Sequence, residues 1–237
     1  MPMSRRNCLK SSAVLLAGTV VAGCDESTPG LDASSADRSR IYEAGASPLE
    51  TSGWTAASGV LPGYPVLEGD RDTDVLVVGA GLAGSSLALH LAEAGVGVIL
   101  LEERQPGWGA SGRNAGHVLP TLKDVSAIRR FPDGGKAFLE SFREHHRIPF
   151  ELAHKHGIDC DATQAGYLHA TARAGTFDEL KKKSLFWRDE QGQQVEWLGA
   201  SDVQAITGST YFDHGVLYRS GGRVNPYLFT NGMVREA

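Results

Sequence analysis

Cysteine is scarce in this chain: only Cys8, Cys24 and Cys160 occur among its 237 residues. Three widely separated cysteines are too few for a disulfide framework or a thiolate metal site. An excess of basic charge is also missing, since the formal net charge is −5, and this argues against a nucleic-acid partner. The hydrophobic content of 41% is nevertheless sufficient for a folded core.

Histidine is grouped, but not in a metal-binding pattern. Four of these residues lie close together in the middle of the chain: His145, His146, His154 and His156. His154 and His156 are two residues apart and would diverge on a helix, and the spacing places no carboxylate beside them. We expect no metal site, and a solvated polar face on a helix over Lys136–Lys155 that Pro149 bends or interrupts.

The N-terminal 24 residues have the layout of a signal peptide. A basic front precedes a short apolar run, Ala13–Gly23, which is too short to form a stable membrane span. Residues 4–10 read SRRNCLK and resemble the twin-arginine export signal. This route suits a protein that must fold around a cofactor before export.

Cys24 ends the apolar run in the sequence Val-Ala-Gly-Cys, which resembles a bacterial lipobox with a lipidated cysteine. The alternative is an ordinary cleaved signal peptide in which Cys24 is incidental. Asp25 resembles a signal for retention at the inner membrane. We therefore predict a lipid-anchored protein on the periplasmic side of the inner membrane. Residues 25–72 are predicted to form a flexible tether, with Gly63–Asp70 lying against the folded domain.

Residues 74–102 have the order strand, glycine turn, helix, strand and acid. The apolar run Val75–Val78 is typical of a strand buried on both faces of a parallel sheet. A G-x-G-x-x-G turn follows and opens a helix that ends at Gly95, and Val98–Leu101 forms the second strand. This arrangement predicts a dinucleotide site.

Each member of the turn has an expected role. Gly79 permits a tight turn, Gly81 lets the backbone approach a pyrophosphate, and Gly84 lets the helix pack closely on the strand. Glu102, at the end of the second strand, is placed to accept hydrogen bonds from a ribose and disfavours NADP. The predicted cofactor-binding residues of this part are Gly79, Ala80, Gly81, Leu82, Ala83, Gly84 and Glu102.

A glycine-rich loop, Gln105–Gly116, follows and contains Ser111, Arg113 and Asn114. Its end, GASGRNAG, closely resembles the loop of FAD-dependent amine and amino-acid oxidases of the D-amino-acid oxidase superfamily. The nearest branch contains gamma-glutamylputrescine oxidase, whose loop reads GASGRNGG. The resemblance implies that the loop passes along the pyrophosphate towards the flavin ring, with Ser111, Arg113 and Asn114 as cofactor contacts.

The resemblance also implies the state of the flavin. Relatives with covalent flavin carry a histidine near the Asn114 position, so non-covalent FAD is expected, with His117 as the nearest histidine.

The same resemblance extends over residues 64–237 and implies an α/β fold. A Rossmann-like FAD-binding domain (73–165) would lead into the start of an α+β substrate domain (166–222). A helix over 223–237 would then return to the first domain. The resemblance implies a chain about twice this long, so we expect an incomplete, C-terminally truncated protein. The superfamily's substrate-orienting residues lie largely in the missing part, and no catalytic residue is predicted.

The expected function is oxidation of a C–N bond in an amine or amino acid to an imine, with oxygen or a membrane quinone as the electron acceptor. Two alternatives stay open at this point. One is an NAD-dependent dehydrogenase, and the other is a non-catalytic nucleotide-binding fragment of a truncated oxidase.

Overall fold

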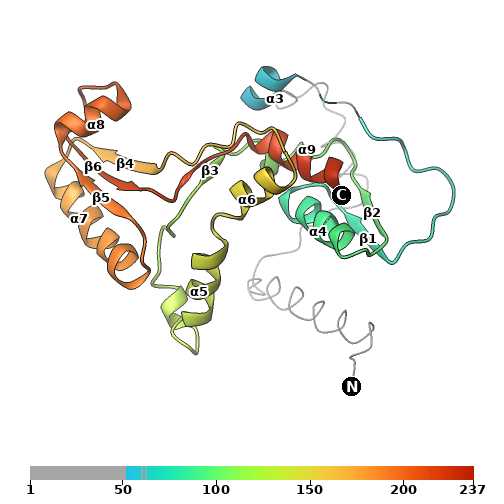
Figure 1. The fold of residues 1–237 in the computed structure, drawn as a ribbon, viewed down its shortest axis with the longest axis horizontal. Coiled ribbons are helices and arrows are strands. Elements are labelled where there is room, and N and C mark those ends of the chain that lie inside the picture. Colours follow the sequence, from blue (N-terminus) through green and yellow to red (C-terminus); the bar gives the residue numbers. More distant parts are fainter. Residues whose placement is uncertain (1–51, 60, 62) are drawn as a thin grey trace, which may run out of the picture. The chain divides into compact units, whose positions relative to one another are not determined.

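The computed structural model describes residues 52–59, 61 and 63–237 (Figure 1). The predicted signal peptide (1–24), including Cys24, and the first part of the predicted tether lie outside the described residues. The described residues all belong to one compact unit. None of the helices described is long and apolar enough to cross a membrane.

A β-α-β unit carries the glycine turn. Strand β1 (Val75–Val78) pairs in parallel with β2 (Val98–Leu101), and α4 (Leu82–Glu93) connects them. Helix α4 packs against both strands, with Gly84 next to Val77 of β1, and its Ala88 and Leu89 are fully buried. It ends before Gly95, whose φ of +71° lies in the left-handed region that glycine adopts without strain. The predicted order of elements is confirmed.

The expected burial of β1 on both faces is wrong. Val77 is buried against the start of α4, but Leu76 is 55% exposed and Val78 is 78% exposed. In the part of the chain that the structure describes, this sheet has two strands. Because side chains alternate across a strand, the face that α4 does not cover remains open.

The segment Gly63–Asp70 lies against the domain only in part. All eight residues are exposed and Val66 is 85% exposed, but Tyr64 and Leu67 are about half buried. Partial burial raises the pKa of Tyr64, and the nearby charge of Arg235 acts against this shift. A short helix, α3 (Gly53–Ser58), precedes it within the predicted tether.

The predicted helix over Lys136–Lys155 is two helices, α5 (Lys136–His145) and α6 (Ile148–Lys155). Pro149 lies in the first turn of α6, where its missing N–H costs no hydrogen bond. The expected solvated histidine face is wrong at two positions. The ring of His146 stacks on Phe142 with 5.9 Å between centroids, and His156 Nε2 lies 2.7 Å from a carboxylate oxygen of Glu93.

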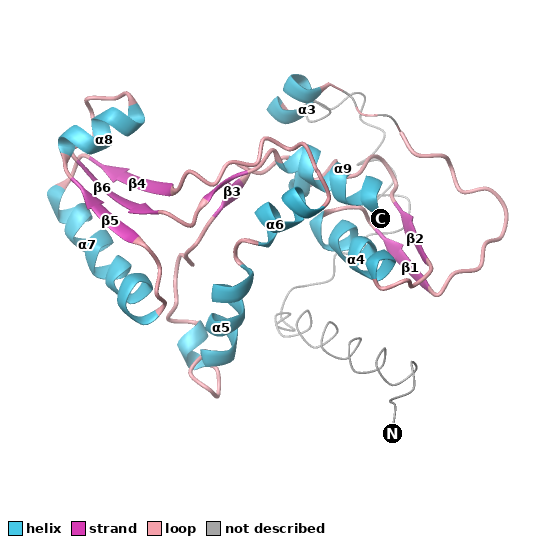
Figure 2. Ribbon diagram, viewed as in Figure 1, coloured by secondary structure: helices cyan, strands magenta, loops and turns pink. Residues whose placement is uncertain are grey.

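A second, antiparallel sheet has the strand order β4-β6-β5 (Figure 2). Its strands are β4 (Tyr167–Thr171), β5 (Val195–Leu198) and β6 (His214–Tyr218). Successive residues of β6 enter different cores: Val216 packs with Trp187, and Leu217 packs with Val203 of α8 (Ala200–Thr207). Helix α7 (Ala174–Leu185) and the one-turn π-helix η3 (Phe186–Glu190) contribute side chains to the core that contains Val216 and Trp187.

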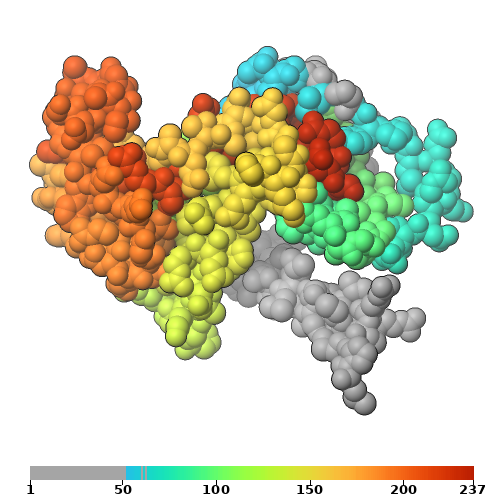
Figure 3. All heavy atoms as spheres, viewed as in Figure 1, coloured from blue at the N-terminus to red at the C-terminus, as the bar shows by residue number. Residues whose placement is uncertain are grey.

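The remaining elements connect the two sheets. Loop residues form η1 (Ala110–Gly112) and η2 (Ile128–Arg130), and β3 (His117–Val118) pairs antiparallel with β7 (Gly222–Arg223). The chain then enters α9 (Pro226–Glu236), which packs against α4; in the space-filling view red atoms of α9 lie beside green atoms of α4 (Figure 3). The predicted domain boundaries at 165/166 and 222/223 stay predictions.

A shared core joins these connecting elements to the β-α-β unit. It brings together Leu89 of α4, Val118 of β3, Leu152 of α6 and Met233 of α9. Cys160 lies in this core and is 1% exposed. Burial raises the pKa of the Cys160 thiol to about 11, so it stays protonated at neutral pH.

Candidate functional site

The glycine turn has the backbone geometry that its sequence predicts. Gly79 has a φ of +99°, and its N–H donates to the Leu101 carbonyl oxygen at 2.7 Å. A Cβ added at Gly84 would lie 1.9 Å from the Gly79 carbonyl oxygen. The positive φ of Gly79 agrees with its expected role in the turn, and the missing Cβ of Gly84 agrees with close packing of the helix on the strand.

Ser111 lies on the start of α4. Its Oγ accepts a hydrogen bond from the Leu82 N–H at 3.0 Å. Gly81 is the N-cap residue and supplies no side-chain cap, and a Cβ added there would lie 2.9 Å from Ser111 Oγ. Ala83 and Gly84 complete the first turn, where backbone N–H groups have no acceptor within the helix. The structure thus brings together the predicted phosphate-binding turn and a predicted loop residue.

Glu102 lies beside the same turn. One carboxylate oxygen accepts from the Ala80 N–H at 2.7 Å, and the other accepts from the Arg104 N–H at 3.1 Å. These bonds hold an exposed carboxylate at the carboxyl end of β2. Its predicted contact with a ribose stays a prediction.

The loop is held from two sides. The Gly107 N–H donates to the Ala80 carbonyl at 2.9 Å, and the amide of Asn231 in α9 donates to the Pro106 carbonyl at 2.9 Å. A Cβ at Gly112 would lie 2.1 Å from the Gly107 carbonyl oxygen. Asn231 was not predicted as a site residue. In the structure Asn231 is a buried polar residue of α9, next to the buried Thr230.

Arg113 stacks on an aromatic ring of the loop. Its guanidinium carbon lies 4.5 Å from the centroid of the Trp108 ring, and that of Arg104 lies 4.0 Å from the same centroid. Such cation–π contacts orient a guanidinium without occupying its N–H donors. The predicted cofactor contact of Arg113 stays a prediction.

Asn114 organises the loop around it. Its amide nitrogen donates to the carbonyl oxygens of Ala110 and Ser111 at 3.1 and 2.9 Å, and its amide oxygen accepts from the Gly116 N–H at 2.8 Å. Its main-chain oxygen accepts from the indole N–H of Trp54 at 2.8 Å. Both ends of the side chain are therefore engaged within the loop, and its predicted contact with the cofactor also stays a prediction.

These groups fit the ADP half of a dinucleotide. The start of α4 offers N–H donors at the positive end of the helix dipole. Glu102 offers a fixed carboxylate for hydroxyl groups. A Cβ added at Gly79 or Gly109 would meet no heavy atom within 4 Å, so space is open above the turn and along the loop.

Two open cavities, of about 670 and 780 Å³, lie elsewhere in the described residues. Both are lined by Arg143, Glu190 and Gln191, and neither is lined by the glycine turn or the loop. No group of three or more metal-ligating side chains occurs in the described part of the chain.

Curated relatives are similar to the chain over about three quarters of its length. Gamma-glutamylputrescine oxidoreductase of Escherichia coli is 31% identical over 178 residues, which cover 73% of this chain and 41% of that protein. The bifunctional protein MnmC for tRNA 5-methylaminomethyl-2-thiouridine biosynthesis of Shewanella amazonensis is 31% identical over 179 residues, covering 73% and 25%. The chain therefore spans less than half the length of these relatives.

A solved structure has a similar fold. The L-amino acid deaminase of Proteus vulgaris superposes with a TM-score of 0.59 at 20% sequence identity, over 75% of this chain and 40% of that one. Residues 74–237 match the DAO family, described as FAD dependent oxidoreductase. This match begins at the β-α-β unit and includes the glycine turn and the loop. The chain belongs to the DAO family of FAD-dependent oxidoreductases, and its cofactor is FAD.

Proposed function

We propose that this chain holds FAD non-covalently and serves the oxidation of a C–N bond in an amine or amino acid to an imine. One observation carries the proposal: the loop bearing Ser111 closes on the glycine turn through the bond from Leu82 N–H to Ser111 Oγ, in a chain of an FAD-dependent family. The nicotinamide alternative loses its support, because the matching family is FAD-dependent.

Different residues would bind different parts of the cofactor. The turn Gly79–Gly84 and the first turn of α4 would hold the pyrophosphate, and Glu102 would accept hydrogen bonds from the ribose. Ser111, Arg113 and Asn114 would line the path towards the flavin. When bound, FAD supplies the hydride-accepting chemistry.

The substrate class rests on the relatives. Gamma-glutamylputrescine oxidoreductase, a protein of methylaminomethyl-thiouridine biosynthesis and an L-amino acid deaminase all carry an amine or amino acid in their names. This shared chemistry supports a substrate with an oxidisable C–N bond. Oxygen or a membrane quinone would accept the electrons.

The location is part of the proposal. The twin-arginine-like motif and Cys24 support export and a lipid anchor on the periplasmic side of the inner membrane. Replacement of Cys24 by serine should move the protein from the membrane fraction to the soluble periplasmic fraction. Equal membrane retention of the two proteins would exclude the lipid anchor.

Spectroscopy of the purified chain tests the function. Bound flavin should give an absorption band at about 450 nm, and acid precipitation should release FAD into the supernatant. Anaerobic addition of a panel of primary amines, secondary amines and amino acids should bleach the band. A colourless protein that binds NAD would overturn the proposal. A yellow protein that no amine bleaches would leave the cofactor site in place and favour the non-catalytic fragment.

A further inference from the structure

Helix α3 lies within the region that the sequence predicted as a tether, yet its start is well defined. Ser52 and Thr55 form a reciprocal capping box, in which the Thr55 N–H donates to Ser52 Oγ at 3.1 Å and the Ser52 N–H donates to Thr55 Oγ1 at 2.8 Å. Such a box satisfies two otherwise unpaired donors and fixes where a helix begins. Trp54 therefore projects from a defined position.

The first attachment of α3 reaches the cofactor loop. The indole N–H of Trp54 donates to the main-chain oxygen of Asn114 at 2.8 Å, across 60 residues of sequence. Asn114 is also the residue whose side chain binds Ala110, Ser111 and Gly116. The Trp54 indole is therefore bonded to the residue whose side chain organises the second half of the loop.

The second attachment reaches the start of α9. Ser58 Oγ accepts from the amide nitrogen of Asn225 at 2.9 Å. Asn225 is 2% exposed and caps α9 by accepting from the N–H groups of Tyr227 and Leu228, both at 3.1 Å. The preceding residue, Val224, donates its N–H to the Gly116 carbonyl at 2.9 Å. Helix α3 is therefore bonded to the segment Ser111–Gly116 itself, at Asn114, and to Asn225, which follows the residue that bonds Gly116.

We propose that α3 holds the Ser111–Gly116 segment in an ordered conformation before FAD binds, with Trp54 as a positioning residue. A glycine-rich loop loses conformational freedom when it closes on a ligand, and ordering it beforehand removes part of that cost. Trp54 acts through the Asn114 main chain and need not touch the cofactor. This inference rests on the proposed assignment of the loop to FAD.

Hydrogen–deuterium exchange and FAD titration of the 237-residue chain test whether α3 orders the segment. Trp54→Phe keeps the aromatic ring but removes the N–H donor. In the FAD-free protein the amides of residues 109–116 should exchange about three- to tenfold faster, the factor for one net hydrogen bond. The dissociation constant of FAD, followed by flavin fluorescence, should rise by a similar factor.

Trp197→Phe is the matched control. It removes an indole donor that bonds Ser184 Oγ at 2.9 Å, in a different part of the fold, and should change neither readout. Unchanged exchange and unchanged FAD affinity in Trp54→Phe would overturn the proposal that α3 orders the segment. If the wild-type chain binds no FAD, the cofactor assignment fails, and the exchange measurement alone decides whether α3 orders the segment.

Ser58→Ala provides a second, milder variant. It removes the acceptor for Asn225 and should also speed exchange of the loop amides. Should Trp54→Phe fail to fold, Ser58→Ala decides: exchange equal to that of the wild type overturns the proposal.

Discussion

Single residues set the geometry of the glycine turn. Gly79 must adopt a positive φ, and Gly84 must lack a side chain because its missing Cβ points at the Gly79 carbonyl. Glu102 binds the same turn from the next strand. Gly84 acts on Gly79 through packing and Glu102 acts on Ala80 through a hydrogen bond, so substitutions at Gly84 and at Glu102 should have different effects.

Replacing Gly84 by alanine should destabilise the fold by about 1–3 kcal/mol, because the new methyl group would lie 1.9 Å from the Gly79 oxygen and force the helix away from the strand. The control is Gly175→Ala in α7, where a Cβ meets nothing within 4 Å and should be neutral or stabilising by up to about 1 kcal/mol. Urea unfolding measures both. Equal stability of the two variants would contradict the packing role.

Replacing Glu102 by glutamine should weaken FAD binding about ten- to hundredfold, since a charged acceptor of hydrogen bonds is lost next to the turn. Glu103→Gln, one residue further on in the bend after β2, should leave affinity unchanged, because it is the Glu102 carboxylate that is bonded to the turn at Ala80. Flavin fluorescence titration measures both constants. A loss confined to Glu103→Gln would reverse the assignment.

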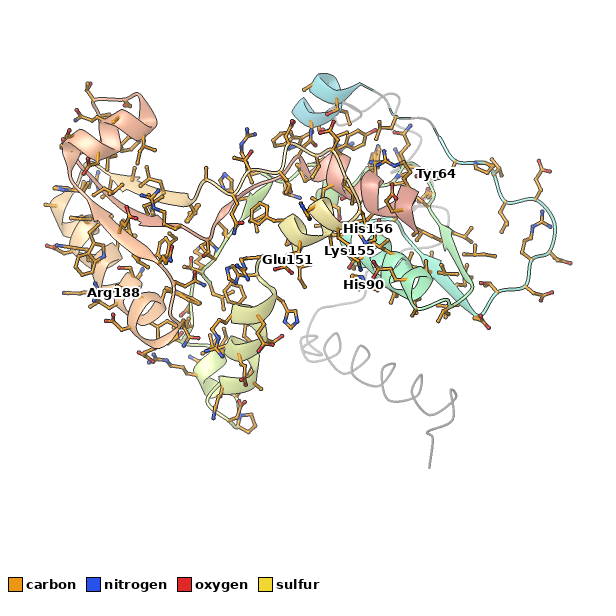
Figure 4. All side chains as sticks on the ribbon, viewed as in Figure 1. Tyr64, His90, Glu151, Lys155, His156 and Arg188 are labelled. Atoms are coloured by element: carbon orange, nitrogen blue, oxygen red, sulfur yellow. The ribbon has the colours of Figure 1, made fainter. Side chains whose placement is uncertain are left out.

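At the scale of elements, ion pairing joins α4 to α6. Glu93 at the end of α4 accepts from Lys155 Nζ of α6 and lies 2.7 Å from Nε2 of His156, the residue that follows α6; Figure 4 labels Lys155 and His156 next to each other. The hydrogen bond from Lys155 is the main cause that holds the pKa of Glu93 below its usual value. The histidines of this region were expected to be solvated, but His156 joins two helices.

The lowered pKa of Glu93 fixes the direction of a pH effect. The contribution of this carboxylate to stability is present above the pKa that it has in the unfolded chain, and is lost as the pH falls through its folded pKa. The melting temperature of wild type should therefore exceed that of Glu93→Gln at pH 7, and the difference should shrink as the pH falls below about 4.

Glu179→Gln on an exposed part of α7 is the control for this effect. Its melting temperature should follow that of the wild type at every pH. A constant difference between wild type and Glu93→Gln from pH 7 to pH 3 would contradict the ion-pair interpretation.

At the scale of the whole molecule, the open face of β1 differs from the two-sided burial that its apolar run indicated. The chain spans 41% of the length of its Escherichia coli relative, and within the described residues α4 covers one face of a two-stranded parallel sheet. Parallel sheets are normally covered on both faces. Exposed apolar strands of this kind promote association.

Replacing Leu76 and Val78 together by threonine should reduce binding of the dye ANS and slow aggregation of the purified chain, while the melting temperature changes little. Both side chains are more than half exposed, so little burial is lost. Val77→Thr on the opposite face should instead destabilise the fold by about 1–3 kcal/mol, because a hydroxyl is buried. Equal effects of the two variants would contradict the one-sided burial of β1.

The sequence by itself determined the β-α-β unit and predicted a dinucleotide site there, while the choice of FAD rested on the resemblance of the loop. The strand, the turn, the start of α4 and the acid after β2 all lie between Val75 and Glu102, and these local signals depend on backbone geometry and alternation. The break between α5 and α6 was predictable for the same reason, since proline acts on its own turn. The signal peptide and the lipid anchor stay predictions.

Only the tertiary structure decided what holds the loop. Trp54 binds Asn114 from 60 residues away, and Asn231 binds Pro106 from 125 residues away. Neither bond has a local signature, because each depends on which surface α3 or α9 packs against. The exposure of Leu76 and Val78 likewise depends on which elements cover the sheet. Short-range sequence signals therefore specify the backbone of the site, while long-range packing specifies how firmly its loop is held.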